Sequence, residues 1–206
     1  MGKLKPGSFN LIEKLESFGK PYFNLADLEK ILGLERPSLY VTLSRLTRAG
    51  VLRRLRRGVY ELSLRPGDVE KVANQIYYPS YLSFEAALAR YGIIAQIPYT
   101  LTFATTRRSK RLSIRQTVVE YRQLKKELFF GYRLVSEVLV AEPEKALLDQ
   151  LYLLSLGKAV LHLDELNLRK LSKKKFLEFA KTYPSRVKGK AEMLAKDFGK
   201  TVVTIR

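Results

Sequence analysis

The chain has 206 residues, 46% of them hydrophobic, which suffices to bury the cores of one large domain or two modest ones. Its 38 Lys and Arg residues outnumber 20 Asp and Glu, and the formal charge of +18 favours a polyanionic partner, nucleic acid before an anionic membrane, over an inert basic surface. With no cysteine and one histidine, the chain cannot form disulfides, thiolate metal sites or multi-histidine metal sites.

The N-terminal residues contain no apolar signal segment, and the richest apolar stretch, 146–156, is interrupted by Asp149 and Gln150. We therefore expect a cytoplasmic protein with no membrane segment. The single histidine, His162, lies in a leucine-rich stretch without a motif, so we expect a structural or surface role for it. No metal, cofactor or catalytic residue is expected.

The first 62 residues predict the element order helix, short strand, helix, turn, helix, hairpin. The first helix has an apolar residue at every third position and ends at Gly19; this stripe comprises Phe9, Ile12, Leu15 and Phe18. A short strand at 22–23 leads to a second helix, which begins at the N-cap Asn24, with Asp27 three residues later, and ends at Gly33. Its predicted buried face comprises Leu25, Leu28, Ile31 and Leu32.

A third helix is predicted from about Pro37 to Ala49, because proline suits a first helical turn and Gly50 supplies a C-terminal stop. Its leucines fall in one narrow sector, which we expect to be buried: Leu39, Leu43 and Leu46. The opposite face and the flanks would be free to enter a DNA major groove, where Arg binds guanine and small side chains approach base edges. The residues expected to contact DNA from this helix are Ser38, Tyr40, Val41, Thr42, Arg45 and Arg48.

Residues 51–62 combine apolar positions with four arginines and a glycine turn at Gly58. This pattern is typical of a hairpin wing, whose guanidinium groups suit phosphate oxygens and whose tip can follow the DNA backbone or enter the minor groove. The arginines expected to do so are Arg53, Arg54, Arg56 and Arg57. The alternatives are a solvated run of charges and an ordinary three-helix core. The joint order of helices, turn glycine and wing favours DNA binding.

A Pro-Gly pair, Pro66-Gly67, follows the hairpin and indicates a boundary, so we expect a winged helix-turn-helix domain at 1–64 and a second domain at 65–206. The second domain is predicted to be mixed α+β, with a small, mainly antiparallel sheet and C-terminal helices. Its predicted helices are 68–76, 84–91, 144–156, 164–171, 173–182 and 186–198, and its predicted strands are 99–105, 118–124, 128–132, 134–141 and 201–205. The fold class is α+β.

Residues 107–111 join two predicted strands and place four positive charges in five residues, so this segment must be exposed. It could make an additional contact with nucleic acid or an acidic partner, and it could equally be a solvated loop. The candidate contact residues are Arg107, Arg108, Lys110 and Arg111. Lys173-Lys174-Lys175 is expected to be a solvated helix start. The aromatic residues of this half are expected to pack in cores rather than stack on bases: Tyr78, Tyr81, Phe84, Phe129 and Phe130.

Three carboxylates, Glu142, Glu144 and Asp149, could serve acid–base or metal chemistry. A Glu-Pro-Glu run is, however, what the electropositive start of a helix favours, so we prefer helix capping.

Several stretches together resemble one known family. In the N-terminal half they are the Leu-Ser-Arg-Leu of 43–46 and the Arg-Arg-Gly-Val-Tyr of 56–60, and in the C-terminal half they are 78–88, 91–94, 105–108, 128–132 and 141–149. On these stretches the chain resembles the AbiEi-family antitoxins, the regulator half of AbiE-type (type IV) toxin–antitoxin pairs. The resemblance implies a winged domain that represses its own operon and a C-terminal domain that opposes a nucleotidyltransferase-like toxin.

Three functions remain open at this point. The first is a DNA-binding repressor of antitoxin type without catalysis, and the second is a protein-interaction antitoxin whose winged domain is only structural. The third is a nucleic-acid-processing enzyme with a metal at the three carboxylates, against which the missing cysteines, the single histidine and the lack of a phosphate-binding glycine loop argue. Because one winged helix reads few base pairs, the expected partner is duplex DNA with an inverted repeat that binds two copies.

Overall fold

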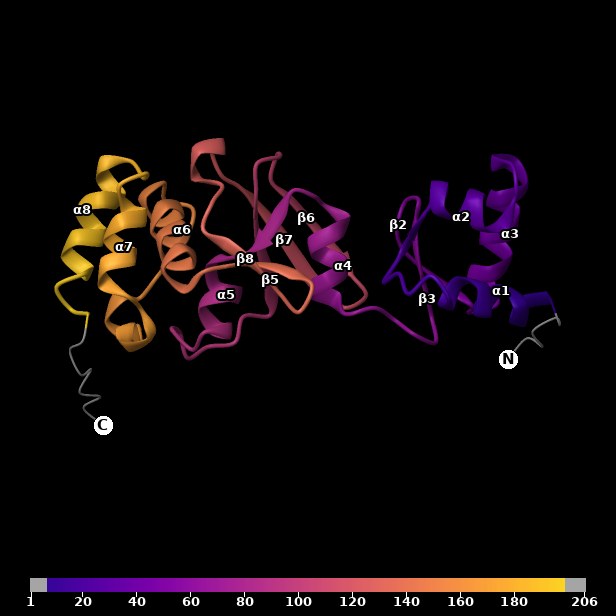
Figure 1. Ribbon diagram of the computed structural model, residues 1–206, viewed down its shortest axis with the longest axis horizontal. Helices are drawn as coiled ribbons and strands as arrows, with labels where there is room; N and C mark the ends of the chain where they lie inside the picture. The colour runs from indigo at the N-terminus through magenta and orange to yellow at the C-terminus, as the bar shows by residue number, and fades with distance from the viewer. Residues whose placement is uncertain (1–6, 199–206) are drawn as a thin grey trace. The chain divides into compact units, whose positions relative to one another are not determined.

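The computed structural model describes residues 7–198, and the chain forms two compact units (Figure 1). Unit 1 comprises Met1–Val72 and Ser113–Gln116, and unit 2 comprises Ala73–Leu112 and Thr117–Arg206. The division therefore falls later than the expected boundary between residues 64 and 65, and a short segment from the second half of the sequence belongs to unit 1. The predicted α+β class is confirmed.

Unit 1 has the predicted order of helices and strands. In chain order they are α1 (Gly7–Glu16), β1 (Phe23–Asn24), α2 (Leu25–Leu32), α3 (Arg36–Arg48), β2 (Leu52–Arg56) and β3 (Val59–Leu62). The strand β3 lies between β1 and β2 and pairs antiparallel with both. This arrangement is a winged helix-turn-helix.

The start of α2 is held by the predicted cap. The Asn24 Oδ1 accepts the Asp27 N–H at 2.8 Å, and the Asp27 carboxylate accepts the Asn24 N–H at 3.0 Å, which completes a capping box. Partial burial acts to raise the pKa of Asp27, but the hydrogen bonds from Lys20 and the Asn24 N–H outweigh it and lower the pKa below its ordinary value. At the other end of α2, Gly33 has φ +63°, the left-handed conformation that glycine adopts without a steric cost.

The core of unit 1 unites all of its helices with the sheet. Its buried members are Leu15, Phe23, Leu28, Ile31, Leu39, Leu43, Leu46, Val51, Leu52, Tyr60 and Leu62. The predicted stripe of the first helix is wrong at its end, because α1 stops at Glu16 and Phe18 is 50% exposed beyond it. The Phe9 side chain lies outside the described part of the structure.

The remaining elements build a sheet and a group of helices. In chain order they are α4 (Val69–Ile76), β4 (Ser80–Leu82), α5 (Phe84–Arg90), β5 (Thr100–Thr105), β6 (Lys110–Ile114), β7 (Thr117–Gln123), η1 (Lys126–Leu128), β8 (Tyr132–Val135), β9 (Val138–Ala141), α6 (Pro143–Ser155), η2 (Leu163–Glu165), η3 (Leu168–Lys170), α7 (Lys173–Ala180) and α8 (Ser185–Leu194). The strand order is β6-β7-β5-β4-β9-β8. The sheet is mixed, because β4 and β9, and also β5 and β7, pair in parallel, whereas β4 and β5, and also β8 and β9, pair antiparallel.

Several predicted elements of this half need correction. The predicted strand 134–141 is a hairpin, in which Ser136 and Glu137 turn the chain with φ of +49° and +66°. Residues 128–131 form the end of η1 and irregular chain instead of a strand, and 164–171 forms two 3-10 turns instead of a helix. The strands β4 and β6 were not predicted, because one is only three residues long and the other begins in the basic run. The predicted strand 201–205 lies outside the described residues.

The helix α6 is the centre of unit 2. It contacts α5, α7, α8 and β9, and Figure 1 shows it between the sheet and the pair formed by α7 and α8. Side chains on every side of α6 are buried, from Glu144 to Leu153. Such all-round burial explains how this helix carries apolar residues without a single stripe, and it also takes Lys145 and Asp149 into the interior.

Candidate nucleic-acid interface

The helix α3 is presented as the sequence predicts. Leu39, Leu43 and Leu46 are buried in the core of unit 1 and fix the orientation of the helix. The opposite face is exposed, and Val41, at 72% exposure, projects further into solvent than most large apolar side chains do. A helix held by one face and free on the other can enter a groove of a partner.

A shallow depression runs along this free face. It is lined by Tyr40, Val41, Ser44, Arg45 and Arg48. Ser38 is also exposed, whereas Thr42 is half-buried. Ser44 was not among the predicted contact residues, although its position on the helical flank could have indicated it. The depression brings two arginines, a hydroxyl and an apolar side chain together, which are the groups that bind guanine, base edges and the thymine methyl.

The positive charge of this face is not compensated by neighbouring acids. Among the residues that the structure describes, neither Arg45 nor Arg48 has an acidic partner, whereas Arg36, at the start of α3, pairs with Glu29 at 2.8 Å. The two arginines at the end of α3 therefore remain available to an external anion.

The wing is a regular hairpin with one irregularity. Leu52, Arg53 and Arg54 of β2 face Leu62, Glu61 and Tyr60 of β3, and the register shifts between Arg54 and Arg56. Gly58 turns the chain at φ +74°, a left-handed conformation that favours glycine at the tip. The four predicted arginines are all exposed.

A buried carboxylate holds the base of this wing. Glu61 has 0% exposure, and Arg115 binds both of its oxygens, from Nε at 2.9 Å and from Nη2 at 2.7 Å. Arg53 approaches the same carboxylate at 3.4 Å, and Arg115 also donates to the carbonyl of Gly67. The hydrogen bonds that Arg115 donates to the Glu61 carboxylate raise the pKa of Arg115 above its ordinary value. Arg53 therefore interacts with a carboxylate of unit 1, whereas the sequence predicted that it would contact DNA.

The second basic segment, 107–111, is exposed as predicted, but it is not a free loop. The guanidinium of Arg107 lies 4.3 Å from the centre of the Tyr77 ring and donates to the Tyr78 carbonyl at 3.2 Å. The Tyr77 hydroxyl in turn donates to the Arg108 carbonyl at 2.8 Å. Arg111 pairs with Glu120 at 3.3 Å, and Lys110 already belongs to β6. The segment is thus an ordered, positively charged surface of unit 2.

The three carboxylates at or near α6 each have a different partner and do not form one site. Glu142 pairs with Lys175, and Glu144 accepts the backbone N–H of Ser172 at 2.8 Å. Glu142 stands at the N-cap with Pro143 behind it, as predicted, but its side chain makes no capping hydrogen bond, which corrects the capping interpretation. Within residues 7–198 no group of three or more acidic or histidine side chains could hold a metal ion. The pairing of Lys175 also corrects the expectation that this lysine is merely solvated.

The third carboxylate, Asp149, is the centre of a buried polar network. It receives hydrogen bonds from Tyr81 at 2.9 Å, Ser83 at 2.8 Å and Tyr183 at 2.7 Å, and it pairs with Lys145 one turn earlier in α6. Burial lowers the pKa of Lys145 and raises the pKa values of Tyr81 and Tyr183 well above the ordinary value. The sequence analysis missed this network. Its one local signal is the i, i+4 spacing of Lys145 and Asp149 in a helix that is apolar all round.

The aromatic residues mostly pack as predicted. Tyr81 and Phe84 are fully buried, and Phe129 and Phe130 are partly buried against the same core. Tyr78 is the exception, since it is 67% exposed. His162 is exposed, in agreement with the surface role that we expected. No helix of the described residues is long and apolar enough to cross a membrane.

A helical core that presents a basic third helix, followed by a hairpin with arginines, defines unit 1 as a winged helix-turn-helix domain. Residues 10–63 match a family model described as "Transcriptional regulator, AbiEi antitoxin". The resemblance stated from the sequence is therefore confirmed over the winged domain. No curated protein matches the sequence.

The fold is also found in a solved structure, that of the RV2827C protein from Mycobacterium tuberculosis. The similarity has a TM-score of 0.65 at 15% sequence identity and covers 96% of this chain and 78% of that chain. At this identity the likeness concerns the fold alone.

Proposed function

We propose that the protein is a DNA-binding transcriptional repressor of antitoxin type, in which α3 enters the major groove of duplex DNA. The observation that carries the proposal is the exposed face of α3, which gathers Arg45, Arg48 and Val41 in a depression that no acidic side chain of residues 7–198 lines. The match of residues 10–63 to a family of transcriptional regulators supports the same function. We place this regulator in the cytoplasm, where it would meet the DNA of its own operon.

The side chains of this domain divide into two roles. In α3, Arg45 and Arg48 bind guanine and Val41 contacts thymine methyl groups. The full set of α3 side chains that contact base edges is Ser38, Tyr40, Val41, Thr42, Ser44, Arg45 and Arg48. The wing arginines contact phosphates and carry no sequence information: Arg53, Arg54, Arg56 and Arg57. We expect Arg53 to contribute least, because Glu61 already competes for its guanidinium.

The site on DNA is an inverted repeat that binds two copies of the chain. One recognition helix reads too few base pairs for useful specificity, and two copies on a symmetric site double the number of base contacts. The remainder of the chain opposes a nucleotidyltransferase-like toxin and has no catalysis of its own. This part of the proposal rests on the antitoxin named in the description of the matching family.

The test is the affinity of the full chain for the DNA upstream of its own gene. Fluorescence anisotropy at fixed salt should show tighter binding to this fragment than to a scrambled duplex of equal length, by at least about 10³-fold. Equal affinity for both duplexes would contradict sequence-specific repression and favour an antitoxin that acts only through protein contacts.

A further inference from the structure

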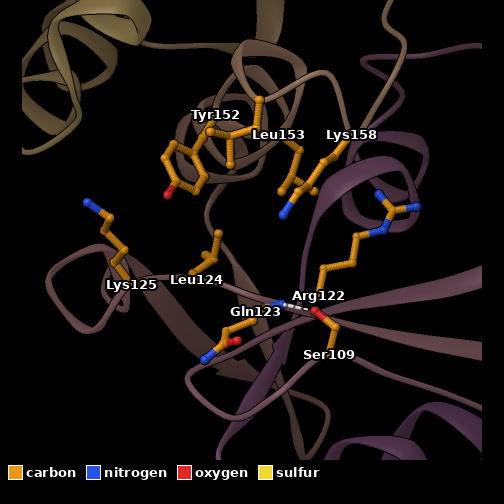
Figure 2. Close-up of a pocket in the computed structure, with 9 residues that line it drawn as sticks. Ser109, Arg122, Gln123, Leu124, Lys125, Tyr152, Leu153 and Lys158 are labelled. Atoms are coloured by element: carbon orange, nitrogen blue, oxygen red, sulfur yellow. Dashed lines mark hydrogen bonds between the residues drawn. The ribbon is translucent and has the colours of Figure 1, made fainter.

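Unit 2 contains a pocket that neither DNA binding nor the buried network uses. It has a volume of about 360 Å³ and lies between the end of β7 and the end of α6 (Figure 2). A cavity of this size lies within the range of small-molecule sites, about 300–1,000 Å³. Three separate segments of the chain line it: Ser109, residues 122–125, and residues 152–158 at Tyr152, Leu153, Leu156 and Lys158.

The charged residues of the lining are all basic. Arg122, Lys125 and Lys158 contribute positive charge, and no acidic side chain lines the pocket. Figure 2 shows Lys158 extending from the loop after α6 toward β7, and Arg122 rising from β7 on the same side. An anion in the pocket would therefore meet cations from two directions and no opposing carboxylate.

The three cations are not equivalent. Arg122 pairs with Glu85 at 2.7 Å and with Glu120 at 3.2 Å. These ion pairs hold its side chain in place and largely compensate its charge. Lys125 has a weak partner, Glu127, at 4.0 Å, where both side chains are mostly exposed. Lys158 has no acidic partner among the residues that the structure describes. The charge available to a ligand is therefore carried by the two lysines, of which Lys158 extends toward β7 whereas Lys125 extends outward, away from Lys158 (Figure 2).

Local structure fixes Lys158 at the pocket. Gly157 turns the chain at φ +67°, and the N–H groups of Gly157 and Lys158 bind the carbonyls of Leu154 and Leu153 at 3.1 and 2.9 Å. These bonds form a Schellman motif that satisfies two carbonyls at the end of α6. The Lys158 ammonium is therefore not required as a helix cap, which is the ordinary reason for a lysine at this position.

Much of the remaining lining is apolar. Leu124, Tyr152 and Leu153 are buried, and Leu156 is half exposed. Ser109 lies opposite, where its oxygen accepts the Gln123 N–H at 3.0 Å and its hydroxyl proton remains able to donate. A ligand that satisfies both sides carries a doubly charged group beside an apolar or aromatic body.

We propose that this pocket binds a small phosphate monoester, whose phosphate is held by Lys158 and Ser109 and by Lys125 once its side chain turns inward, and whose body packs on Leu153 and Leu156. A phosphate is favoured over a carboxylate because it carries nearly two negative charges at pH 7, which matches two lysines that act as point charges. A bidentate carboxylate would instead use an arginine fork, and the fork of Arg122 is occupied. The inference goes beyond the proposed repression of transcription and does not depend on it.

The test is a titration of the full chain with phenyl phosphate at constant ionic strength. Binding is monitored by NMR through the amide resonances of residues 123–125 and 158. A resonance readout is necessary because the wing arginines also attract anions. Phenyl phosphate should shift these amides and bind more tightly than inorganic phosphate. Binding should weaken between pH 7.5 and pH 5, because the second ionisation of a phosphate monoester lies near pH 6.

Two variants locate the contacts. Lys158→Glu should weaken phenyl phosphate binding about tenfold, whereas Lys174→Glu, the same charge change at an exposed lysine of α7, should leave it unchanged. Leu156→Ser should weaken phenyl phosphate binding but not inorganic phosphate binding, since only the first has a body.

Three results would overturn the proposal. The first is equal binding of inorganic phosphate and phenyl phosphate, which would leave only a non-specific anion effect. The second is an equal loss in both lysine variants, or the absence of shifts at the pocket in a folded protein. The third is a Lys158-dependent response to a single-stranded oligonucleotide without one to phenyl phosphate, which would assign the pocket to a nucleic-acid surface.

Discussion

Glu61 shows how a single buried charge supports an exposed surface. Its carboxylate has no access to water, and the guanidinium of Arg115 supplies most of its hydrogen bonds. The cost of transferring a carboxylate out of water is offset only while such a partner is present. The wing strand β3 therefore depends on a residue more than fifty positions away in the sequence.

Arg115→Ala should lower the free energy of unfolding by about 3 kcal/mol, because it leaves Glu61 buried with only the distant Arg53 guanidinium. Urea unfolding monitored by circular dichroism measures the change. The double variant Glu61→Gln/Arg115→Ala should recover part of the loss, since it removes the uncompensated charge. Arg186→Ala, at an exposed arginine, is the control and should change stability by less than about 0.5 kcal/mol.

Arg45 is the residue of α3 on which sequence preference should depend most. Arg45→Ala should weaken binding to the upstream DNA by about 1–3 kcal/mol and narrow the difference from scrambled DNA, because the lost contact is to a base. Arg45→Lys should restore the overall attraction but not the preference, since lysine lacks the bidentate fork. Anisotropy with both duplexes measures this, and an equal loss on both would place Arg45 at the backbone instead.

At the scale of the element, the wing and α3 should respond differently to salt. Arg54→Ala and Arg57→Ala should weaken binding to all duplexes similarly. Each should reduce the slope of log affinity against log salt by about 0.9, because each phosphate contact releases counterions. Arg53→Ala is the internal comparison and should reduce the slope less, since Glu61 already engages that side chain. Unchanged slopes in the first two variants would show that the hairpin does not contact DNA.

The capping box of α2 predicts a pH dependence of stability. The pKa of Asp27 is lowered in the folded state, so its contribution is present above the unfolded value, about 4, and is lost as pH falls through the folded value. Asp27→Ala should therefore cost about 1 kcal/mol at pH 7. The difference from the original chain should shrink below pH 4 in urea unfolding. A difference that is independent of pH would indicate a cost of packing rather than of charge.

At the scale of the whole molecule, repression and toxin opposition should separate. The full chain with Arg45→Ala and Arg54→Ala together should lose binding to the upstream DNA and still suppress the growth defect caused by an adjacent nucleotidyltransferase-like gene product. Both substituted residues are exposed in unit 1, so unit 2 should fold as before. Co-expression followed by growth curves decides this. Failure of the unsubstituted chain to suppress the defect would leave a regulator without antitoxin activity.

The sequence alone determined most of the winged domain. Its signals are local: Asn24 and Asp27 cap a helix, glycines end helices, and the leucines of α3 recur on one face. Such patterns depend on neighbours within four residues, so they can be read without knowledge of the fold. Once the buried leucines of α3 are assigned to one face, the candidate DNA-contact residues are those on the opposite face and the flanks.

What only the tertiary structure decided involves contacts between distant segments. The pairing of Glu61 with Arg115, the network around Asp149 and the pocket beside Lys158 each unite residues from separate elements. The hairpin of β8 and β9 was also hidden, because its turn uses Ser136 and Glu137 instead of the usual asparagine and glycine. Whether a charged side chain is buried, and whether a lysine has an acidic partner, depends on residues that are distant in the sequence and become neighbours only in the folded chain.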